Sequence, residues 1–198
     1  LENDEAFRAR IQLVMESYSP HGTEGSYVYW ALDADDRVVD VAVYGPNQGL
    51  DPAIPAAEPK MVVLSSEGNG TADAALLGAV FDNCMADQRR PVADKLTVIS
   101  ATPVPYQIQA VLHVTSAASA GAVLAAAQLT ADGFISNRLR IGRKLYRASL
   151  AAALSVPGVV DVVITHPAAD LDIGPFEAPY CTAVNLTAEA VSGGWRDV

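Results

Sequence analysis

The chain has 198 residues, which is enough for one large domain or for two small domains that each bury a core. Hydrophobic residues make up 51% and charged residues 18%, which suits a subunit that buries surface against partners, although a compact monomer can have this composition. The formal net charge of −10 argues against binding to nucleic acid or an anionic membrane, because either needs a basic face. No apolar run approaches a membrane span in length, and no secretory signal is found.

The first predicted element is a helix from about Asp4 to Tyr18, ended by Ser19-Pro20-His21-Gly22. Its apolar stripe consists of Phe7, Ile11, Val14, Met15 and Tyr18. Such a stripe must pack on its own domain or on a neighbour, and we expect another subunit or an upstream domain. The chain begins at Leu1 rather than Met, so we expect a piece of a longer reading frame or residues added in cloning.

A first α+β domain is predicted over residues 26–104. It has a short helix with Tyr27, Trp30 and Ala31 on one face, followed by valine-rich strands at Arg37–Tyr44 and Lys60–Ser65. Thr71 is the expected N-cap of the next helix, which Arg89-Arg90-Pro91 should close before a strand at Leu96–Ala101. The predicted buried stripe of that helix is Ala74, Leu77, Val80, Phe81, Cys84 and Met85.

The loop Gly45–Pro59 contains four prolines and two glycines, so we expect no regular structure in it. Loops of this length in compact domains are usually functional or disordered. We interpret it as a contact loop or a mobile tip.

A second α+β domain is predicted over residues 105–198, after a boundary at Pro103-Val104-Pro105. The strand Tyr106–Thr115 alternates, with Ile108, Ala110, Leu112 and Val114 on one face. A helix at 118–139, a short strand at 141–147 and a brief helix capped by Ser149 should follow. Pro157-Gly158 turns the chain into strands at 159–165 and 180–187.

The predicted fold class is therefore α+β, with two small domains preceded by an N-terminal helical segment, residues 1–25. We expect mixed or antiparallel sheets with helices packed on one face of each.

Gly68-Asn69-Gly70 lies between a strand and a helix, the order found in phosphate-binding loops. Asp73, however, occupies the position where the dinucleotide fingerprint has its third small residue, and no Gly-Lys-Ser/Thr is present. A carboxylate in the first helical turn would also repel a phosphate. We interpret the segment as a tight turn before a capped helix.

Metal and catalytic patterns are equally weak. His166 with Asp170 and Asp172 is the one local group that resembles a hard-metal site. Asp33, Asp35 and Asp36 resemble the start of a calcium loop, but Val38 occupies the required glycine position and Tyr44 that of the glutamate. His21 and His113 lie on other predicted elements. Cys84 and Cys181 are expected to be ordinary reduced thiols.

No nucleophile elbow, cysteine–histidine arrangement or Ser-x-x-Lys pair is found. We therefore predict no catalytic, metal-binding or cofactor-binding residues, and no enzyme. Acids that converge from distant segments leave no sequence signature, so an α+β enzyme domain using His166, Asp170 and Asp172 is the alternative. A small protein-binding module that uses the Gly45–Pro59 loop is a further alternative.

The order of several motifs resembles the central region of the baseplate J-like family of contractile phage tails and phage-tail-like particles. The motifs are Ser-x-Glu-Gly-x-Gly from Ser65, Arg-Pro-Val-x-Asp-Lys-Leu-Thr-Val from Arg90, Pro-Tyr-x-Ile from Pro105, and Gly142-Arg143 followed by LAAALSVPGVVDV. The stretch from Gly22 to Pro46 also looks like the family's entry into its middle domain. The resemblance covers roughly residues 22–187 and does not include the family's larger upstream domain, so we expect this chain to be the middle and C-terminal part of such a protein.

The resemblance implies a structural wedge subunit of a tail baseplate that acts through protein–protein contacts and has no catalytic residues. It implies that two copies of the protein combine with one tail protein I-like partner, and that six wedges form a ring around the tube. The expected location is the virion tail baseplate, assembled in the bacterial host cytoplasm. The particle could be an infectious phage, a bacteriocin-like tail or a prophage remnant.

Overall fold

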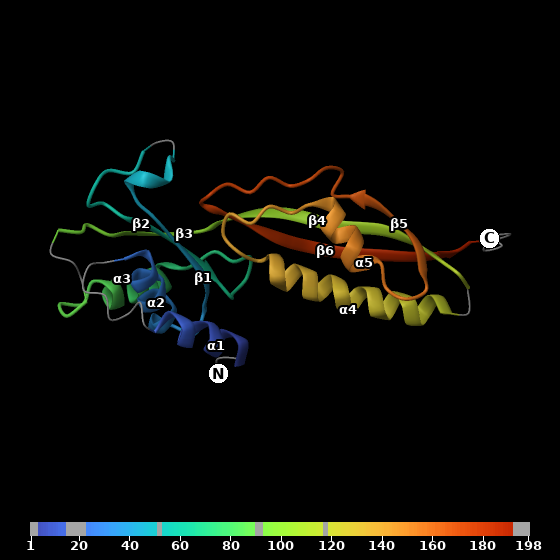
Figure 1. Ribbon diagram of the computed structural model, residues 1–198, viewed down its shortest axis with the longest axis horizontal. Helices are drawn as coiled ribbons and strands as arrows, with labels where there is room; N and C mark the ends of the chain where they lie inside the picture. Colours follow the sequence, from blue (N-terminus) through green and yellow to red (C-terminus); the bar gives the residue numbers. More distant parts are fainter. Residues whose placement is uncertain (1–3, 15–22, 51–52, 90–92, 117–118, 192–198) are drawn as a thin grey trace. The chain divides into compact units, whose positions relative to one another are not determined.

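The computed structural model describes residues 4–14, 23–50, 53–89, 93–116 and 119–191. The chain divides into two compact units, which are described separately below. Unit 1 contains Leu1–Pro103 together with Pro175–Ala178, and unit 2 contains Val104–Gly174 and Pro179–Val198. Each unit has a three-stranded sheet and helices, so the predicted α+β class is confirmed (Figure 1).

The sheet of unit 1 has the order β1-β2-β3, formed by Val38–Tyr44, Lys60–Ser65 and Thr97–Ser100. β1 is antiparallel to β2, whereas β3 is parallel to it, so the sheet is mixed. Residues 61–64 of the central strand are all buried, which shows that both faces of the sheet are covered.

Helices α2 (Glu24–Ala34) and α3 (Ala74–Cys84) pack on one face of this sheet. Thr23 is the N-cap of α2 and accepts a hydrogen bond from the Ser26 N–H. Tyr27, Trp30 and Ala31 are buried, as the spacing predicts, and the two aromatic rings meet edge to face at 5.6 Å.

The structure corrects the predicted start and face of α3. The N-cap is Asp73 rather than Thr71, because the Asp73 carboxylate accepts a hydrogen bond from the Leu76 N–H at 2.7 Å. Thr71 instead forms an isolated β-bridge with Leu64. The helix ends at Cys84, before the predicted Arg-Arg-Pro stop, of which Arg90 and Pro91 lie outside the described residues.

The buried side of α3 is formed by Leu76, Val80 and Cys84, which are spaced four residues apart. Of the predicted stripe, Val80 and Cys84 are confirmed, whereas Leu77, Phe81 and Met85 each lie one residue after a buried position. Ala74 and Phe81 are exposed, and Leu77 is half-buried.

The N-terminal helix α1 spans Asp4–Leu13. Of its predicted apolar stripe, Phe7 and Ile11 are 49% and 52% exposed, and Val14 is half-buried. Met15 and Tyr18 lie outside the described residues, as does His21.

The sheet of unit 2 has the order β5-β4-β6, formed by Val159–His166, Thr102–Val114 and Glu177–Ala190. β5 is antiparallel to β4. β6 runs parallel to β4: Thr182 Oγ1 donates to the Tyr106 carbonyl, and the Val191 N–H donates to the Val114 carbonyl further along both strands.

Strand β4 continues through Pro103 and Pro105, where the sequence suggested a break. The carbonyls of Tyr106 and Val114 face β6, so odd-numbered residues of β4 direct their backbone groups toward the β5 side. Pairing with β5 begins only at Gln109. The absent N–H groups of the two prolines therefore interrupt no hydrogen bond of the sheet.

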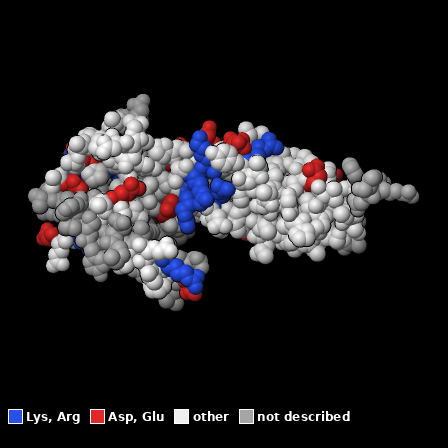
Figure 2. Space-filling view, in the orientation of Figure 1, with Lys and Arg blue, Asp and Glu red and all other residues white. Residues whose placement is uncertain are grey.

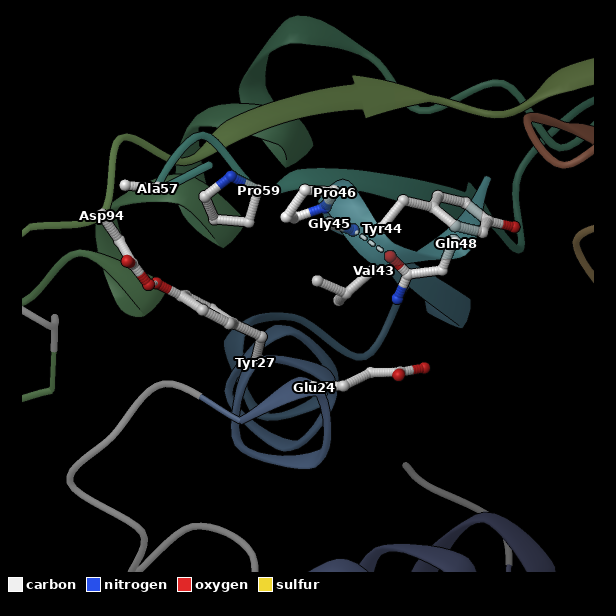
Figure 3. A pocket seen from close by; sticks show the side chains of 10 residues that line it. All are labelled: Glu24, Tyr27, Val43, Tyr44, Gly45, Pro46, Gln48, Ala57, Pro59 and Asp94. Atoms are coloured by element: carbon white, nitrogen blue, oxygen red, sulfur yellow. Dashed lines mark hydrogen bonds between the residues drawn. The ribbon is translucent and has the colours of Figure 1, made fainter. Parts of the chain in front are cut away.

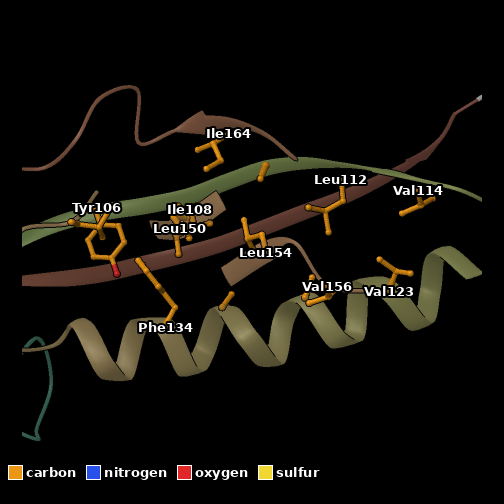
Figure 4. Close-up of a cluster of buried hydrophobic side chains, with 14 residues drawn as sticks. Tyr106, Ile108, Leu112, Val114, Val123, Phe134, Leu150, Leu154, Val156 and Ile164 are labelled. Carbon is orange, nitrogen blue, oxygen red and sulfur yellow. The ribbon is translucent and has the colours of Figure 1, made fainter. Parts of the chain in front are cut away.

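Helices α4 (Ala120–Arg138) and α5 (Arg147–Leu154) cover the core face of this sheet (Figure 4). The predicted alternation of β4 is confirmed, because Ile108, Ala110, Leu112 and Val114 are all at most 3% exposed. They meet Val123 and Phe134 of α4 and Leu154 of α5 in one hydrophobic core.

Two other predictions in unit 2 are wrong. The segment 141–147 forms no strand, since only Leu145 makes a bridge, to Leu171. Ser149 lies inside α5, and the first N–H of that helix, at Arg147, donates to the Asp170 carboxylate at 2.8 Å. A distant aspartate thus takes the capping role that was assigned to the local serine.

Candidate functional site

The Gly-Asn-Gly turn is built to reverse the chain tightly. Gly68 and Gly70 have φ angles of +58° and +93°, which L side chains rarely adopt. A Cβ atom at Gly70 would lie 2.8 Å from Leu64 Cδ1, so the turn packs directly on the preceding strand. The N-terminus of α3 that follows is already occupied by its own carboxylate, Asp73.

Arg37 binds the acids that surround this turn. Its guanidinium forms two hydrogen bonds with the Asp35 carboxylate, at 2.9 and 3.0 Å. It also lies 3.5 Å from carboxylate oxygens of both Glu67 and Asp73. The paired guanidinium lowers the pKa of Asp35 and its own pKa is raised by that carboxylate. These acids therefore connect the ends of β1, β2 and α3.

Two acids of the calcium-like sequence pair with arginines. Asp33 lies 3.8 Å from the Arg89 guanidinium, and Asp35 also accepts a hydrogen bond from the Arg37 N–H. Within the residues that the structure describes, no group of three His, Cys, Asp or Glu side chains could hold a metal ion.

The group His166, Asp170 and Asp172 is not assembled into a common site. Asp170 accepts from the Arg147 N–H, whereas Asp172 pairs with Lys144 at 2.8 Å. The Arg147 guanidinium donates to the carbonyls of Ile164 and Ala168, on either side of His166. These contacts fasten the loop after β5 to the start of α5, so their role is structural.

The two cysteines are free thiols in protective surroundings. Burial raises the pKa of Cys84 to about 12, and it raises the pKa of the half-buried Cys181 as well. A thiol that stays protonated near neutral pH is a poor nucleophile and a poor metal ligand. His113 lies 3.6 Å from Asp161 across β4 and β5, an exposed cross-strand pair.

A pocket of about 220 Å³ in unit 1 is formed by residues that sequence reasoning did not bring together (Figure 3). Its walls come from α2, from the end of β1 and the loop that follows it, and from Asp94. The Tyr27 hydroxyl donates to the Asp94 carboxylate at 2.8 Å, and burial together with this bond raises the pKa of the tyrosine. The other titratable groups that line it are Glu24 and Tyr44. Because burial and the bond to Asp94 raise its pKa, the Tyr27 phenol stays protonated and is not an activated nucleophile.

The Gly45–Pro59 loop forms one wall of this pocket and is tied to unit 1 at several points. It contains the short 3-10 turn η2 (Pro46–Gln48), and Ile54 is 5% exposed. The carbonyls of Ala57 and Pro59 accept hydrogen bonds from the N–H groups of Lys95 and Thr97. No sequence signal links residue 94 to this loop, because the pairing is tertiary.

The segment Pro175–Ala178 lies in the predicted loop before the last strand of the second domain, but it packs with unit 1. The Tyr44 hydroxyl donates to the Pro175 carbonyl at 2.6 Å, and the Tyr44 and Phe176 rings meet edge to face at 5.4 Å. Lys60 Nζ lies 5.3 Å from the centre of the Phe176 ring. The carbonyl of Phe176 accepts a hydrogen bond from the Thr102 N–H.

The described residues thus form an α+β protein whose polar side chains mainly hold its own turns, caps and loops. In the part of the chain that the structure describes, no helix is both long and apolar enough to cross a membrane.

Comparison with known proteins identifies the family. The Baseplate J-like central domain matches residues 20–100, and the Baseplate J-like protein C-terminal domain matches residues 106–187. Baseplate protein J of Escherichia phage P2 is 36% identical over 194 residues, which cover 98% of this chain and 60% of that protein. The chain belongs to the baseplate J-like family, and the resemblance identified from its motifs is confirmed.

A solved structure has a similar fold. A chain in the cryo-EM structure of the anti-feeding prophage baseplate, 6-fold symmetrised, matches with a TM-score of 0.60 over 88% of this chain and 41% of that chain. The sequence identity is 14%, so the comparison concerns the fold. The chain therefore spans less than two thirds of each longer protein that it resembles, 60% of the phage P2 protein and 41% of the anti-feeding prophage chain.

Proposed function

We propose that this chain is a structural part of a contractile-tail baseplate, where it acts through protein–protein contacts as a segment of a wedge subunit. The observation that carries the proposal is the continuous similarity to baseplate protein J, which extends over 98% of the chain and includes both family domains. We propose no catalytic role, because the acids of the alternative enzyme site bind elsewhere in this fold: Asp170 accepts from the Arg147 N–H and Asp172 pairs with Lys144.

The proposed partners are a second copy of the same protein and a tail protein I-like subunit, in the virion tail baseplate after assembly in the host cytoplasm. The test is to co-express the full-length protein that contains this chain with the tail protein I-like protein of the same gene cluster. We expect one complex in size-exclusion chromatography with light scattering, with a mass that fits two copies and one partner. Separate migration of the two proteins would overturn the wedge proposal.

The N-terminal segment, residues 1–25, is proposed to link the first domain, residues 26–104, to an upstream domain of the longer protein. Ile11 of α1 is 52% exposed, as expected for a residue that another domain or subunit covers. In the full-length protein, Ile11→Glu should weaken wedge assembly, whereas the neighbouring exposed Gln12→Glu should not. Equal assembly of both variants would contradict this proposal.

A further inference from the structure

Positive charge is concentrated in one short segment of an acidic chain. Residues 138–147 contain five of the 13 Lys and Arg residues of a protein whose net charge is −10. We call this the basic segment, and its cations are Arg138, Arg140, Arg143, Lys144 and Arg147. It contains no Asp or Glu, and Figure 2 shows a cluster of Lys and Arg side chains on one face of the molecule.

Three arginines of the basic segment, Arg140, Arg143 and Arg147, donate to backbone carbonyls. Arg143 donates to the Asn137 carbonyl at 3.1 Å, and Arg140 donates to the Leu139 carbonyl at 3.0 Å. These bonds satisfy carbonyls at the C-terminal end of α4. A guanidinium has five N–H donors, so each arginine is positioned while most of its donors stay available.

One ion pair with a carboxylate is found for the basic segment among the described residues, between Lys144 and Asp172. The pair is exposed, and pairs of this kind contribute little to stability. Most of the positive charge in the segment is therefore available to a charged partner.

Arg138 and Arg143 line an open hollow of about 520 Å³ in unit 2, between the C-terminal half of α4 and Ala153 of α5. Phe134 and Ala153 supply apolar lining, and the Arg138 guanidinium lies 5.1 Å from the centre of the Phe134 ring. Gly133 widens the hollow, since a Cβ atom there would meet no atom within 4 Å. No acid contributes to the lining.

The two arginines and the apolar lining together indicate which kind of molecule the hollow can bind. Arginine forms paired hydrogen bonds with a carboxylate, and the aromatic and alanine surfaces beside it favour an apolar side chain. A long polyanion such as nucleic acid would extend beyond the basic segment and meet the acidic remainder of the protein. A short acidic segment would contact only the positive face.

We infer that the hollow binds an acidic segment of another protein, with a carboxylate at Arg138 and Arg143 and a neighbouring apolar side chain against Phe134 and Ala153. This inference deepens the proposed function, since it names the chemistry of one partner contact in the baseplate. Charge complementarity between the basic segment and a carboxylate-rich surface of the partner would favour this contact.

The test uses the whole chain and a fluorescein-labelled peptide of repeated Glu-Glu-Leu, with binding measured by fluorescence anisotropy at low ionic strength. We expect saturable binding that weakens as salt is added. Arg143→Glu should weaken binding roughly tenfold or more, and Arg143→Lys should weaken it less, because it keeps the charge but loses the paired geometry.

The matched control is Lys95→Glu, which makes the same change in net charge at a side chain that is 80% exposed in unit 1. It should leave the peptide affinity within about twofold, since Lys95 does not line the hollow. Circular dichroism of each variant checks the fold. An equal loss in the two variants would overturn the inference, because bulk charge would then explain the binding.

Three further results would also overturn it: no binding of the Glu-Glu-Leu peptide, equal binding of a Glu-Glu-Ser peptide, or tighter binding of a single-stranded DNA of similar length. The Ser peptide tests the apolar contact, and the DNA tests the polyanion alternative. Assembly with the tail protein I-like subunit is measured separately in the full-length protein. Failure of the peptide test would therefore leave the proposed baseplate function in place.

Discussion

A single glycine, Gly158, fixes the turn that leads into β5 of unit 2. Its φ angle is +96°, and a Cβ atom there would lie 2.9 Å from Val123 Cγ2 in α4. The residue thus combines a backbone angle that favours glycine with close packing between the turn and a helix.

Gly158→Ala should lower the free energy of unfolding of unit 2 by about 1–3 kcal/mol, because it adds both backbone strain and a steric contact. Urea denaturation followed by circular dichroism measures the change. Gly133→Ala is the matched control: this glycine lies inside α4 with open space at its Cβ position. Alanine should stabilise that helix by about 0.5–1 kcal/mol, and a loss of stability there would contradict the assignment.

The capping of α3 can be tested at the same scale. Asp73→Ala should lower the free energy of unfolding by about 1 kcal/mol. The change leaves the Leu76 N–H without its side-chain acceptor and removes one acid beside Arg37. Thr71→Ala, at the position that the sequence suggested as the cap, should cost only a few tenths of that value. Thermal unfolding of both variants compares the two sites. A larger loss for Thr71→Ala would reverse the assignment of the cap.

Among the elements, β4 has the clearest division between its two faces. Leu112 is fully buried in the core of unit 2, whereas its neighbour Val111 is half-buried on the opposite face. Leu112→Ala should destabilise unit 2 by about 2–5 kcal/mol, because it removes buried methyl groups and leaves a cavity.

Val111→Ala is the control for Leu112→Ala, and it should lower the free energy of unfolding by about 1 kcal/mol or less. Chemical denaturation of the two variants in parallel gives the difference. Similar losses would mean that both faces of β4 are equally covered, contrary to the structure.

The buried face of an element could be predicted only where polar residues clearly separate it from the exposed face. In β4 the glutamines and His113 mark the outer face, so the inner face could be predicted correctly. In α3 the residues from Leu76 to Phe81 are small or apolar almost without interruption, and several helical faces fit the pattern equally well. Contacts with the sheet then select Leu76, Val80 and Cys84.

At the scale of the whole molecule, the family could be identified from the sequence because its motifs occur in a fixed order. The tertiary contacts of the polar residues could not be predicted from the sequence. Asp170 caps a helix that begins 23 residues earlier in the chain, and Phe176 packs with Tyr44, which is more than a hundred residues away. Pairings over such separations leave no local pattern. The same reason explains why the pocket around Asp94 and the hollow beside Arg143 became visible only in the structure.

Buried phenols and thiols in both units lead to a prediction for the protein as a whole. Burial raises the pKa values of Tyr27 and Cys84 in unit 1 and of Tyr106 and Cys181 in unit 2. In the unfolded chain the thiols begin to lose protons above about pH 8 and the phenols above about pH 9, because their ordinary pKa values are about 8.5 and 10. The folded protein keeps those protons, so it binds more protons than the unfolded chain and its stability falls as pH rises.

The free energy of unfolding should therefore be nearly constant from about pH 7 to 8 and should decrease steadily between about pH 9 and 11. Urea denaturation at a series of pH values measures this slope. Tyr106→Phe keeps the buried ring but removes the hydroxyl that titrates, so the loss of stability of unit 2 at high pH should become smaller. An unchanged slope in this variant, or a stability that rises above pH 9, would show that buried protonated groups do not control the alkaline behaviour.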